Sequence, residues 1–307
     1  MHPDQLTVSP HTVRTLVDHQ FPAWRDLPIT AVASHGTVNA IFRIGDHLAA
    51  RFPLREGSVE ATRRQQTVEA DAARELAGHT RFPTPAPVAL GEPGFGYPLP
   101  WSVQTWIPGV AASHDDPAQS THFARDLADF IADVRSLDTH GRTFHGLGRT
   151  GRGGELKTHD AWMDTCFERT EQVLPDLDVD VHIARLRQMW TAFRQLPRTG
   201  ADTMTHGDLI PGNVLVARGR LAGVLDVGGL GPADPALDLV GAWHLLDTGP
   251  RQVLREYLAC DDLEWQRGKA WAFEQAMGTV WYYRDSNPPM SRMGRRTLER
   301  IVSDELA

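Results

Sequence analysis

Short apolar runs, separated by glycine- and proline-rich breaks, dominate the first third of the chain. Their apolar and β-branched residues favour extended strands over helices. Five segments fit this pattern: residues 29–35, 38–44, 47–52, 88–90 and 99–107. Gly45 and Asp46 lie between two of these runs and predict a hairpin turn. The pattern therefore predicts a small, mostly β region.

One segment of this region has helical spacing instead. From Ser58 to Ala77, apolar and small residues recur on one face, and Gly78 follows where a glycine often ends a helix. After Pro108 and Gly109 the helical period prevails. Further helices are predicted at residues 116–137, 160–173, 180–195, 235–247, 250–259, 264–284 and 291–305.

Two segments interrupt the helical region. Residues 138–160 are glycine-rich and predict a loop. Residues 203–227 carry two short apolar strands, 213–217 and 221–226, with a turn at 218–220 between them. A hairpin is therefore expected within an otherwise helical region.

Together these patterns predict an α+β fold in two parts, residues 1–107 and 108–307. A chain of 307 residues is longer than one hydrophobic core usually organises, which also favours two parts. Asp116 followed by Pro117 has the pattern of a helix cap and a first helical residue, so the second part should begin its first helix there.

Composition and charge narrow the class of protein. No apolar run approaches the roughly 20 residues that cross a bilayer, and the first residues lack the pattern of a signal peptide. We therefore expect a cytoplasmic protein in which Cys166 and Cys260 are buried free thiols. The net charge of −8 argues against nucleic acid or an anionic membrane as a partner, and it suits a cationic ligand. The sequence leaves the oligomeric state open.

The candidate chemistry lies between Thr205 and Gly229. Asp208 is followed by Asn213 five positions later, and Asp226 stands at the end of the returning hairpin strand. Phosphoryl transfer uses such a set, because one carboxylate accepts the proton of the attacking hydroxyl while an amide and a second carboxylate hold Mg²⁺. The simpler alternative is that the three residues cap a turn and two strand ends.

Protein kinases space a catalytic Asp, an Asn and a metal-binding Asp in the same way. Here Gly207 stands where those enzymes have arginine, and Val227 and Gly228 follow the metal-binding position. These differences point away from a protein kinase and toward a kinase of small molecules.

The chain resembles the aminoglycoside phosphotransferase family, kinase-like enzymes that phosphorylate antibiotics and small hydroxylated metabolites. The resemblance covers nearly the whole chain and rests on separated motifs in the family's order: GTVNAIFRIG (36–45), LAARFP (48–53), YPLPWSVQTWIPG (97–109), HGDLIPGNVLV (206–216), GVLDVGG (223–229), GPADPALDLVGAW (231–243), RGKAWAF (267–273) and YYRDSNP (282–288). It implies a bilobal protein-kinase-like fold, with residues 1–107 as the nucleotide-binding lobe. Residues 108–307 would form the catalytic and substrate-binding lobe.

The resemblance also implies roles for single residues. Asp208 matches the catalytic base, and Asn213 and Asp226 match the ligands of Mg²⁺. His206 is expected to brace the catalytic loop through hydrogen bonds. Nucleotide contacts fall on these positions: Gly36, Thr37, Asn39, Arg51, Glu69, Gln104, Thr105 and Trp106.

Arg51 stands where the family has a lysine that contacts the nucleotide phosphates. Arginine keeps the charge but presents a planar fork, so the replacement is not neutral. Glu69 is the expected partner of Arg51, and a solvated position for either residue is the alternative. Residues 104–106 would offer backbone groups to the purine, a contact that does not distinguish ATP from GTP.

The remaining acidic residues suggest further roles. We expect Asp234 to start a helix and Asp238 to bind backbone N–H groups of the catalytic loop. Carboxylates that would suit a cationic acceptor are Asp160, Asp164, Glu274 and Asp285.

The sequence therefore predicts an ATP- or GTP-dependent O-phosphotransferase that acts on an aminoglycoside-like antibiotic. A housekeeping or biosynthetic kinase of another metabolite has the same catalytic residues and stays an alternative. A nucleotide-binding protein without catalysis is a third, because Arg51 departs from the family pattern.

Overall fold

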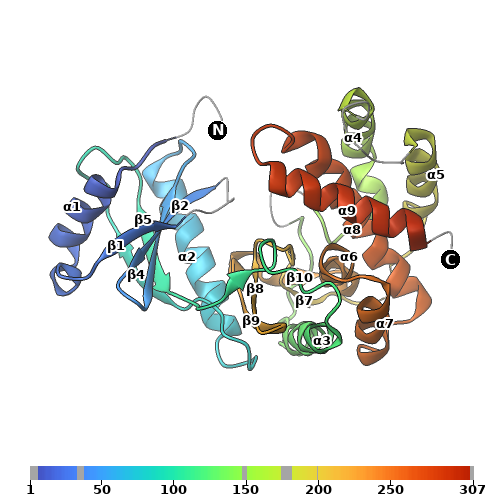
Figure 1. Ribbon diagram of the computed structural model, residues 1–307, viewed down its shortest axis with the longest axis horizontal. Helices are drawn as coiled ribbons and strands as arrows, with labels where there is room; N and C mark the ends of the chain where they lie inside the picture. Colours follow the sequence, from blue (N-terminus) through green and yellow to red (C-terminus); the bar gives the residue numbers. More distant parts are fainter. Residues whose placement is uncertain (1–5, 33–37, 147–150, 174–181, 199, 305–307) are drawn as a thin grey trace. The chain divides into compact units, whose positions relative to one another are not determined.

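The computed structural model describes residues 6–32, 38–146, 151–173, 182–198 and 200–304 (Figure 1). Its backbone contacts divide the chain into two compact units. Unit 1 comprises Met1–Ala77 and Pro83–Pro108, and unit 2 comprises Gly78–Phe82 and Gly109–Ala307.

Unit 1 contains a five-stranded sheet whose neighbouring strands are all antiparallel. The strands are β1 (Ile29–Val32), β2 (Asn39–Ile44), β3 (Leu48–Pro53), β4 (Pro87–Gly91) and β5 (Trp101–Thr105), in the order β1-β2-β3-β5-β4. The five predicted strands are confirmed, with bounds that differ by one or two residues; residues 33–35 of the first prediction lie outside the described residues. Gly45 has a φ of 56°, as the predicted hairpin turn requires.

Helix α1 (Pro10–Gln20) was not predicted from the sequence. Ser9 caps its first turn by accepting a hydrogen bond from the backbone N–H of Thr12 at 3.0 Å, and Pro10 occupies the first helical position. Its buried residues, Val13, Leu16 and Val17, pack into the apolar core of the sheet. A short helix with only three buried residues leaves a weak periodic signal.

Alternation along β3 directs its side chains to two different faces. Ala50 and Phe52 belong to the core that α1 covers, and Phe52 stacks on Trp101 with ring centroids 4.8 Å apart. Arg51 lies between them in sequence and so points to the opposite face. Helix α2 (Val59–Leu76) supplies Glu69 there.

The predicted bounds of α2 are confirmed. Ser58 accepts a hydrogen bond from the backbone N–H of Ala61 at 3.1 Å, and the helix ends at the cap Ala77. Gly78 then adopts a φ of 79°, the left-handed conformation that ends many helices.

Unit 2 is mostly helical. Its longer helices are α3 (Thr121–Arg135), α4 (Asp160–Val173), α5 (Ile183–Phe193), α6 (Val240–Leu245), α7 (Thr248–Tyr257), α8 (Asp262–Tyr282) and α9 (Pro288–Asp304). Two small sheets accompany them: β6 (Val110–Ala111), β8 (Val214–Ala217) and β9 (Arg220–Val224) in one, β7 (Thr203–Thr205) and β10 (Gly231–Ala233) in the other. Both are antiparallel.

The hairpin of β8 and β9 confirms the prediction for residues 213–226, although Asn213 and Asp226 lie just outside its strands. The predicted start of the first helix is wrong. Helix α3 begins at Thr121 because Ser120 accepts a hydrogen bond from the Phe123 N–H at 3.1 Å. Asp116 instead accepts from the Ala118 N–H, which forms a turn before the helix.

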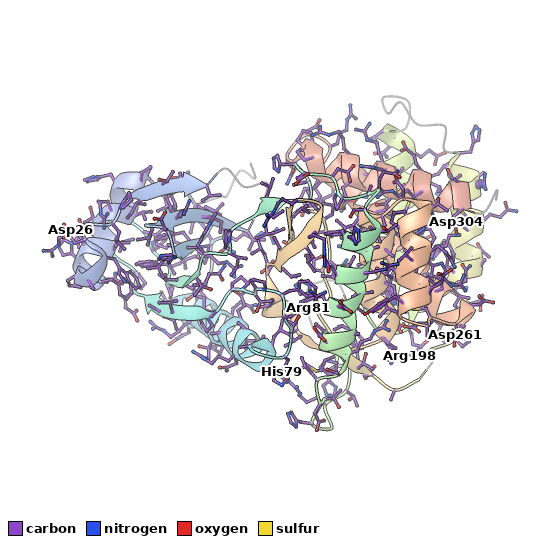
Figure 2. All side chains as sticks on the ribbon, turned by 60° about the horizontal axis from the view of Figure 1, so that its bottom comes forward. Asp26, His79, Arg81, Arg198, Asp261 and Asp304 are labelled. Atoms are coloured by element: carbon purple, nitrogen blue, oxygen red, sulfur yellow. The ribbon has the colours of Figure 1, made fainter. Side chains whose placement is uncertain are left out.

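Helix α3 is tied to the hairpin through the buried carboxylate of Asp126. Arg220 donates to Asp126 through Nη2 at 2.6 Å, and the backbone N–H of Leu221 donates to it at 3.3 Å. Arg81, which lies beside α3 in Figure 2, donates to the same carboxylate at 3.0 Å. These bonds fix the turn of the hairpin to α3.

Helix α8 forms the centre of unit 2 and packs against α9, α4 and the short helix η5 (Pro235–Leu239). Gly268 and Gly294 permit this packing, since a Cβ atom at either would lie less than 3.0 Å from a neighbouring atom. Among the described residues, no helix has the length and apolar composition needed to cross a membrane.

Candidate active site

The candidate catalytic loop joins β7 to β8 and is held in place by Asp238. The Asp238 carboxylate accepts hydrogen bonds from the backbone N–H groups of His206 and Gly207, each at 2.8 Å. Gly207 has a φ of 81°, a conformation that an arginine at this position would adopt only with strain. The prediction that Asp238 binds the backbone of this loop is confirmed.

His206 is fully buried and braces the loop from inside. The backbone N–H of Asp208 donates to His206 Nδ1 at 3.3 Å, and His206 Nε2 lies 3.0 Å from the carbonyl oxygen of Leu225. Nδ1 accepts and Nε2 therefore donates, which defines a neutral imidazole with its proton on Nε2. These contacts match the bracing role expected of His206.

Asp208 has donors at both carboxylate oxygens. Asn213 donates through Nδ2 to Oδ2 at 2.9 Å and to the Asp208 carbonyl oxygen at 3.0 Å. Gln275 of α8 donates to Oδ1 at 2.9 Å, and Arg152 lies 3.4 Å from the same oxygen. The side chain keeps 35% of its surface exposed, so an acceptor hydroxyl can still reach it.

Asn213 and Asp226 fit the requirements of a magnesium site. Because Asn213 directs its Nδ2 at Asp208, its Oδ1 is turned away from Asp208 and can serve as a ligand. The backbone N–H of Leu225 donates to the Asn213 carbonyl oxygen at 2.7 Å, so Leu225 lies opposite Asn213 and Asp226 follows one residue later. An amide oxygen and a carboxylate are hard donors of the kind that Mg²⁺ prefers, with water completing its shell.

Asp226 has a φ of 56° and a ψ of 49°, a left-handed conformation that is uncommon for a residue with a Cβ atom. Aspartate tolerates this conformation better than most side chains do. In the described part of the chain, no cluster of three or more His, Cys, Asp or Glu side chains could hold a metal. A magnesium site here would therefore rely on the Asn213 oxygen.

Arg152 and Gln275 are neighbours of Asp208 that the sequence reasoning missed. Arg152 belongs to the glycine-rich segment read as a loop, where nothing marks one arginine among several. Gln275 directly follows Glu274, which was selected for its charge, and an uncharged amide drew no attention. Only the fold brings both beside Asp208.

The proposed nucleotide residues that the structure describes lie on β2, β3, α2 and β5, with Trp106 directly after β5. Arg51 Nη1 lies 3.3 Å from Glu69 Oε2 and 3.5 Å from Gln104 Oε1, so the expected pairing of Arg51 with Glu69 is present. Arg51 is held by these contacts with 14% of its side chain exposed. Asn39 is the first residue of β2, whereas Gly36 and Thr37 lie outside the described residues.

Two backbone N–H groups expected to contact the purine are used within unit 1. Thr105 donates to the Ala86 carbonyl oxygen at 2.9 Å, and Trp106 donates to the His47 carbonyl oxygen at 2.7 Å. Their N–H groups therefore do not face a purine here, and their carbonyl oxygens remain as candidates for this contact.

The four predicted acceptor-binding carboxylates differ in their surroundings. Asp160 binds Arg194 Nε at 2.8 Å and Trp190 Nε1 at 3.0 Å, and the hydrogen bond from Arg194 is the main reason that its pKa is lowered. Asp164 and Asp285 are exposed. Asp160 is thus already paired with a cation of its own chain.

Glu274 departs furthest from the expectation of a ligand-binding carboxylate. It is 2% exposed, and its Oε1 lies 3.0 Å from His159 Nδ1. Because a buried carboxylate with its own partner cannot pair with an incoming ammonium group, Glu274 supports the protein structure instead. The choice of Glu274 as an acceptor contact is corrected accordingly.

Asp234 confirms its predicted role at the start of a helix. Its Oδ1 accepts from the backbone N–H of Ala236 at 3.0 Å, which caps η5. Its Oδ2 accepts from Arg267 Nε at 2.7 Å and from Trp271 Nε1 at 3.1 Å. This buried pair joins η5, which carries Asp238, to α8.

Two curated aminoglycoside phosphotransferases are similar to this chain in sequence. An aminoglycoside 3′-phosphotransferase from Streptomyces fradiae is 31% identical over 188 residues, which span 58% of this chain and 64% of that protein. An aminoglycoside 3′-phosphotransferase from Escherichia coli is 39% identical over 61 residues, 20% of this chain and 22% of that protein. The matched segments thus cover less than two thirds of either relative.

Solved structures show a similar fold over nearly the whole chain. The GDP complex of aminoglycoside 2′-phosphotransferase-IIIa has a TM-score of 0.68 at 18% identity and covers 97% of this chain and 100% of that chain. A macrolide 2′-phosphotransferase from Brachybacterium faecium has a TM-score of 0.61 at 18% identity, with 92% and 97% covered. The predicted α+β, kinase-like fold is confirmed.

A family profile matches residues 29–271, which include every part of the candidate catalytic loop and hairpin. This chain belongs to the phosphotransferase enzyme family.

Proposed function

We propose that the protein transfers the γ-phosphoryl group of ATP or GTP to a hydroxyl group of an aminoglycoside-like antibiotic. The observation that carries this proposal is the environment of Asp208, which is partly exposed and is oriented by Asn213 at 2.9 Å and Gln275 at 2.9 Å. A protein that only bound nucleotide would not need an exposed carboxylate fixed in this way.

Asp208 acts as the base in this proposal. Its carboxylate orients the acceptor hydroxyl and accepts the proton as the hydroxyl oxygen attacks the γ-phosphorus. The bond from the γ-phosphorus to the β–γ bridging oxygen breaks, and ADP or GDP leaves. Asn213 and Asp226 would hold Mg²⁺, and the bound ion would offset negative charge on the phosphate oxygens. Arg51, oriented by Glu69, supplies positive charge to the phosphates of the donor.

The choice of acceptor rests on the relatives. The curated relatives are aminoglycoside 3′-phosphotransferases, and one similar structure is a GDP and kanamycin complex of an aminoglycoside phosphotransferase. Similar structures hold GDP or ADP, so both donors are candidates.

A less cationic acceptor is a second candidate. Asp160 and Glu274 are already paired with Arg194 and His159, which removes two carboxylates that a polyamine would use. Macrolide phosphotransferases are also among the similar structures. This supports a test in which hydroxylated antibiotics of both kinds are compared.

The test is an assay of the purified protein with ATP or GTP, Mg²⁺, and a panel of aminoglycosides and macrolides. Mass spectrometry of each antibiotic should find the mass of one added phosphoryl group. Asp208→Asn is the matched control and should form this product at least about 100-fold more slowly. If no antibiotic gains a phosphoryl group, the antibiotic assignment is wrong, and a screen of hydroxylated metabolites then tests the biosynthetic alternative.

A further inference from the structure

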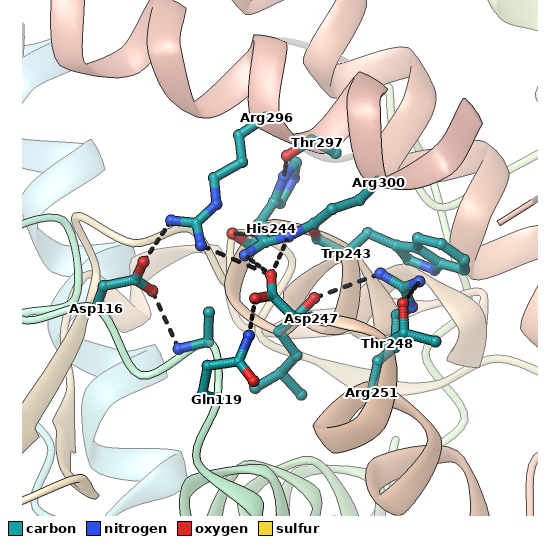
Figure 3. A network of polar contacts seen from close by, with 12 residues as sticks. Asp116, Gln119, Trp243, His244, Asp247, Thr248, Arg251, Arg296, Thr297 and Arg300 are labelled. Atoms are coloured by element: carbon teal, nitrogen blue, oxygen red, sulfur yellow. Dashed lines mark hydrogen bonds and ion pairs between the residues drawn. The ribbon is translucent and has the colours of Figure 1, made fainter. Parts of the chain in front are cut away.

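Asp208 is the first of four side chains that form a continuous line of hydrogen bonds through unit 2. Gln275 Nε2 lies 2.9 Å from Asp208 Oδ1, and Gln275 Oε1 lies 3.0 Å from His244 Nε2. His244 Nδ1 lies 2.9 Å from Thr297 Oγ1, a contact that Figure 3 draws. The line thus joins the proposed base to α8, α6 and α9 in turn.

The carboxylate at one end fixes the direction of the first two bonds, and a neutral His244 ring then fixes the third. Asp208 only accepts, so Gln275 must turn its NH₂ group toward Asp208 and its Oε1 toward His244. His244 Nε2 must then carry the proton that it donates to Oε1. Nδ1 of the neutral ring is left to accept, so the hydroxyl of Thr297 donates to it. The opposite amide orientation would place Gln275 Oε1 against a carboxylate oxygen.

His244 is suited to this position because it is neutral. The ring is 3% exposed, and burial is the main cause that lowers its pKa to about 4. A protonated ring would donate from both nitrogens, so Thr297 would accept from Nδ1 and turn its single hydroxyl proton to the Met293 carbonyl oxygen, which reverses the third bond. Thr297 is itself fully buried, and its Oγ1 also lies 3.0 Å from the Met293 carbonyl oxygen.

The backbone that carries His244 is anchored separately. Arg300 Nη1 donates to the carbonyl oxygens of His244 at 2.7 Å and Trp243 at 3.1 Å. Arg300 is in turn held by Asp247, which accepts from its Nη2 at 2.8 Å (Figure 3). The end of α6 is therefore fixed to α9, and the backbone of His244 is held rigidly.

We propose that Gln275, His244 and Thr297 are positioning residues that hold Asp208 in one rotamer through hydrogen bonds of one fixed direction. The inference rests on the proposed role of Asp208 as the base. No proton moves along this line during the reaction. The line of hydrogen bonds fixes the Asp208 carboxylate where a hydroxyl can approach. A loosely held base loses most of its rate advantage.

The first test determines which nitrogen of His244 carries the proton and needs no acceptor. Nitrogen-15 NMR of the imidazole rings distinguishes the two tautomers, and His244→Gln assigns the signal by its disappearance. In the wild type we expect the proton on Nε2. In Gln275→Met, Nε2 loses its acceptor, so the proton should move to Nδ1 and Thr297 should donate to Met293 instead. A proton on Nδ1 in the wild type, or the same tautomer in both proteins, overturns the proposal.

The second test measures phosphoryl transfer to kanamycin with GTP and ATP. Losing the bond from Gln275 to a carboxylate should lower kcat roughly 10- to 100-fold in Gln275→Met, with nucleotide KM changed less than about twofold. His244→Gln keeps an N–H donor near the position of Nε2, so its kcat should stay within about threefold of the wild type. His244→Leu, which has no donor, should match Gln275→Met.

The comparison of the two His244 variants separates positioning from simple loss of packing. Equal kcat values for His244→Gln and His244→Leu, or an unchanged kcat in Gln275→Met, would contradict the proposal. If the wild type phosphorylates neither kanamycin nor another antibiotic, the proposed function fails. The NMR measurement of the His244 tautomer does not depend on activity, so it still tests the direction of the hydrogen bonds.

Discussion

The carboxylate of Asp238 lies 2.8 Å from the backbone nitrogen of Gly207, the residue that precedes the proposed base. The same carboxylate binds the backbone N–H of His206 at 2.8 Å. Asp238 is fully buried in η5, and η5 is attached to α8 through Asp234 and Arg267. The position of the catalytic loop therefore depends on side chains that never meet the substrate.

Replacing Asp238 with asparagine keeps the size of the side chain but should weaken its hydrogen bonds to the catalytic loop. The new NH₂ group would face a backbone N–H, so one hydrogen bond is lost and two donors oppose each other. We expect a loss of about 1–3 kcal/mol in the free energy of unfolding and a fall in kcat. Urea denaturation and the antibiotic assay measure the two effects. Asp262→Asn, at a side chain that is 96% exposed, should change stability by less than about 1 kcal/mol.

Asp208→Asn should separate binding from chemistry. The amide cannot accept the hydroxyl proton, so kcat should fall by about 100-fold or more, in the range lost with a general base. Nucleotide affinity, measured by calorimetry with a non-hydrolysable analogue, should stay nearly the same, because the proposed phosphate contacts lie elsewhere. Normal turnover in this variant would show that Asp208 is not the base.

Arg51→Ala should weaken nucleotide binding. Removing one charge-assisted contact to phosphate is expected to raise the nucleotide KM about tenfold or more. Arg51→Lys retains the charge and so serves as the matched control, with a smaller increase. Initial rates over a range of ATP and GTP concentrations give both values. A KM for Arg51→Ala equal to that of the wild type would mean that Arg51 does not contact the donor.

The pair of His159 and Glu274 predicts a pH dependence of stability. Burial acts to lower the His159 pKa, but the hydrogen bond and charge of Glu274, helped by the Gly151 carbonyl oxygen, outweigh it and raise the pKa above 6.5. The folded state therefore binds this proton more tightly than the unfolded chain does. Its stabilisation is fully present below pH 6.5 and is lost as the pH rises through the folded-state pKa.

Denaturant unfolding of the wild type and of His159→Gln at a series of pH values tests this. The wild type should lose more of its free energy of unfolding than His159→Gln as the pH rises above 6.5. Titrating groups outside the pair of His159 and Glu274 are common to both proteins and cancel in the difference. Parallel curves would show that His159 keeps the same protonation in the folded and unfolded states.

Gly268→Ala tests the close packing of α8. An added Cβ would lie 2.5 Å from Leu239 Cβ, so the overlap should cost about 1–3 kcal/mol of stability, against which the helix propensity of alanine gains about 1 kcal/mol. Gly249→Ala in α7 is the control, because no atom lies within 4 Å of the added Cβ. We expect a lower melting temperature only for the first variant.

The strands and most helices could be predicted because their patterns are local. Ser58 and Gly78 mark both ends of α2, and the apolar runs of the sheet stand between turn residues. Helix α3 was placed too early because two plausible caps, Asp116 and Ser120, lie four residues apart. In the structure Ser120 caps the helix, and its hydroxyl also donates to the Gly219 carbonyl oxygen, a distant partner that local sequence does not reveal.

The candidate site was predicted only in part, for the same reason. Asp208, Asn213 and Asp226 lie on one loop and hairpin, so their spacing already suggests that they meet. Gln275 and Arg152 come from segments far along the chain, and nothing local marks them. Glu274 is buried beside His159, and its charge in the sequence does not reveal this partner.

Glu274 and Gln275 are consecutive residues of α8, yet one meets His159 and the other meets Asp208. A slip of this helix by a single residue would replace the amide at Asp208 with a carboxylate or with the methyl group of Ala276. The site therefore tolerates little movement of α8 along its axis. Laboratory evolution toward a new acceptor should accordingly accumulate changes in other segments and leave the register of this helix alone.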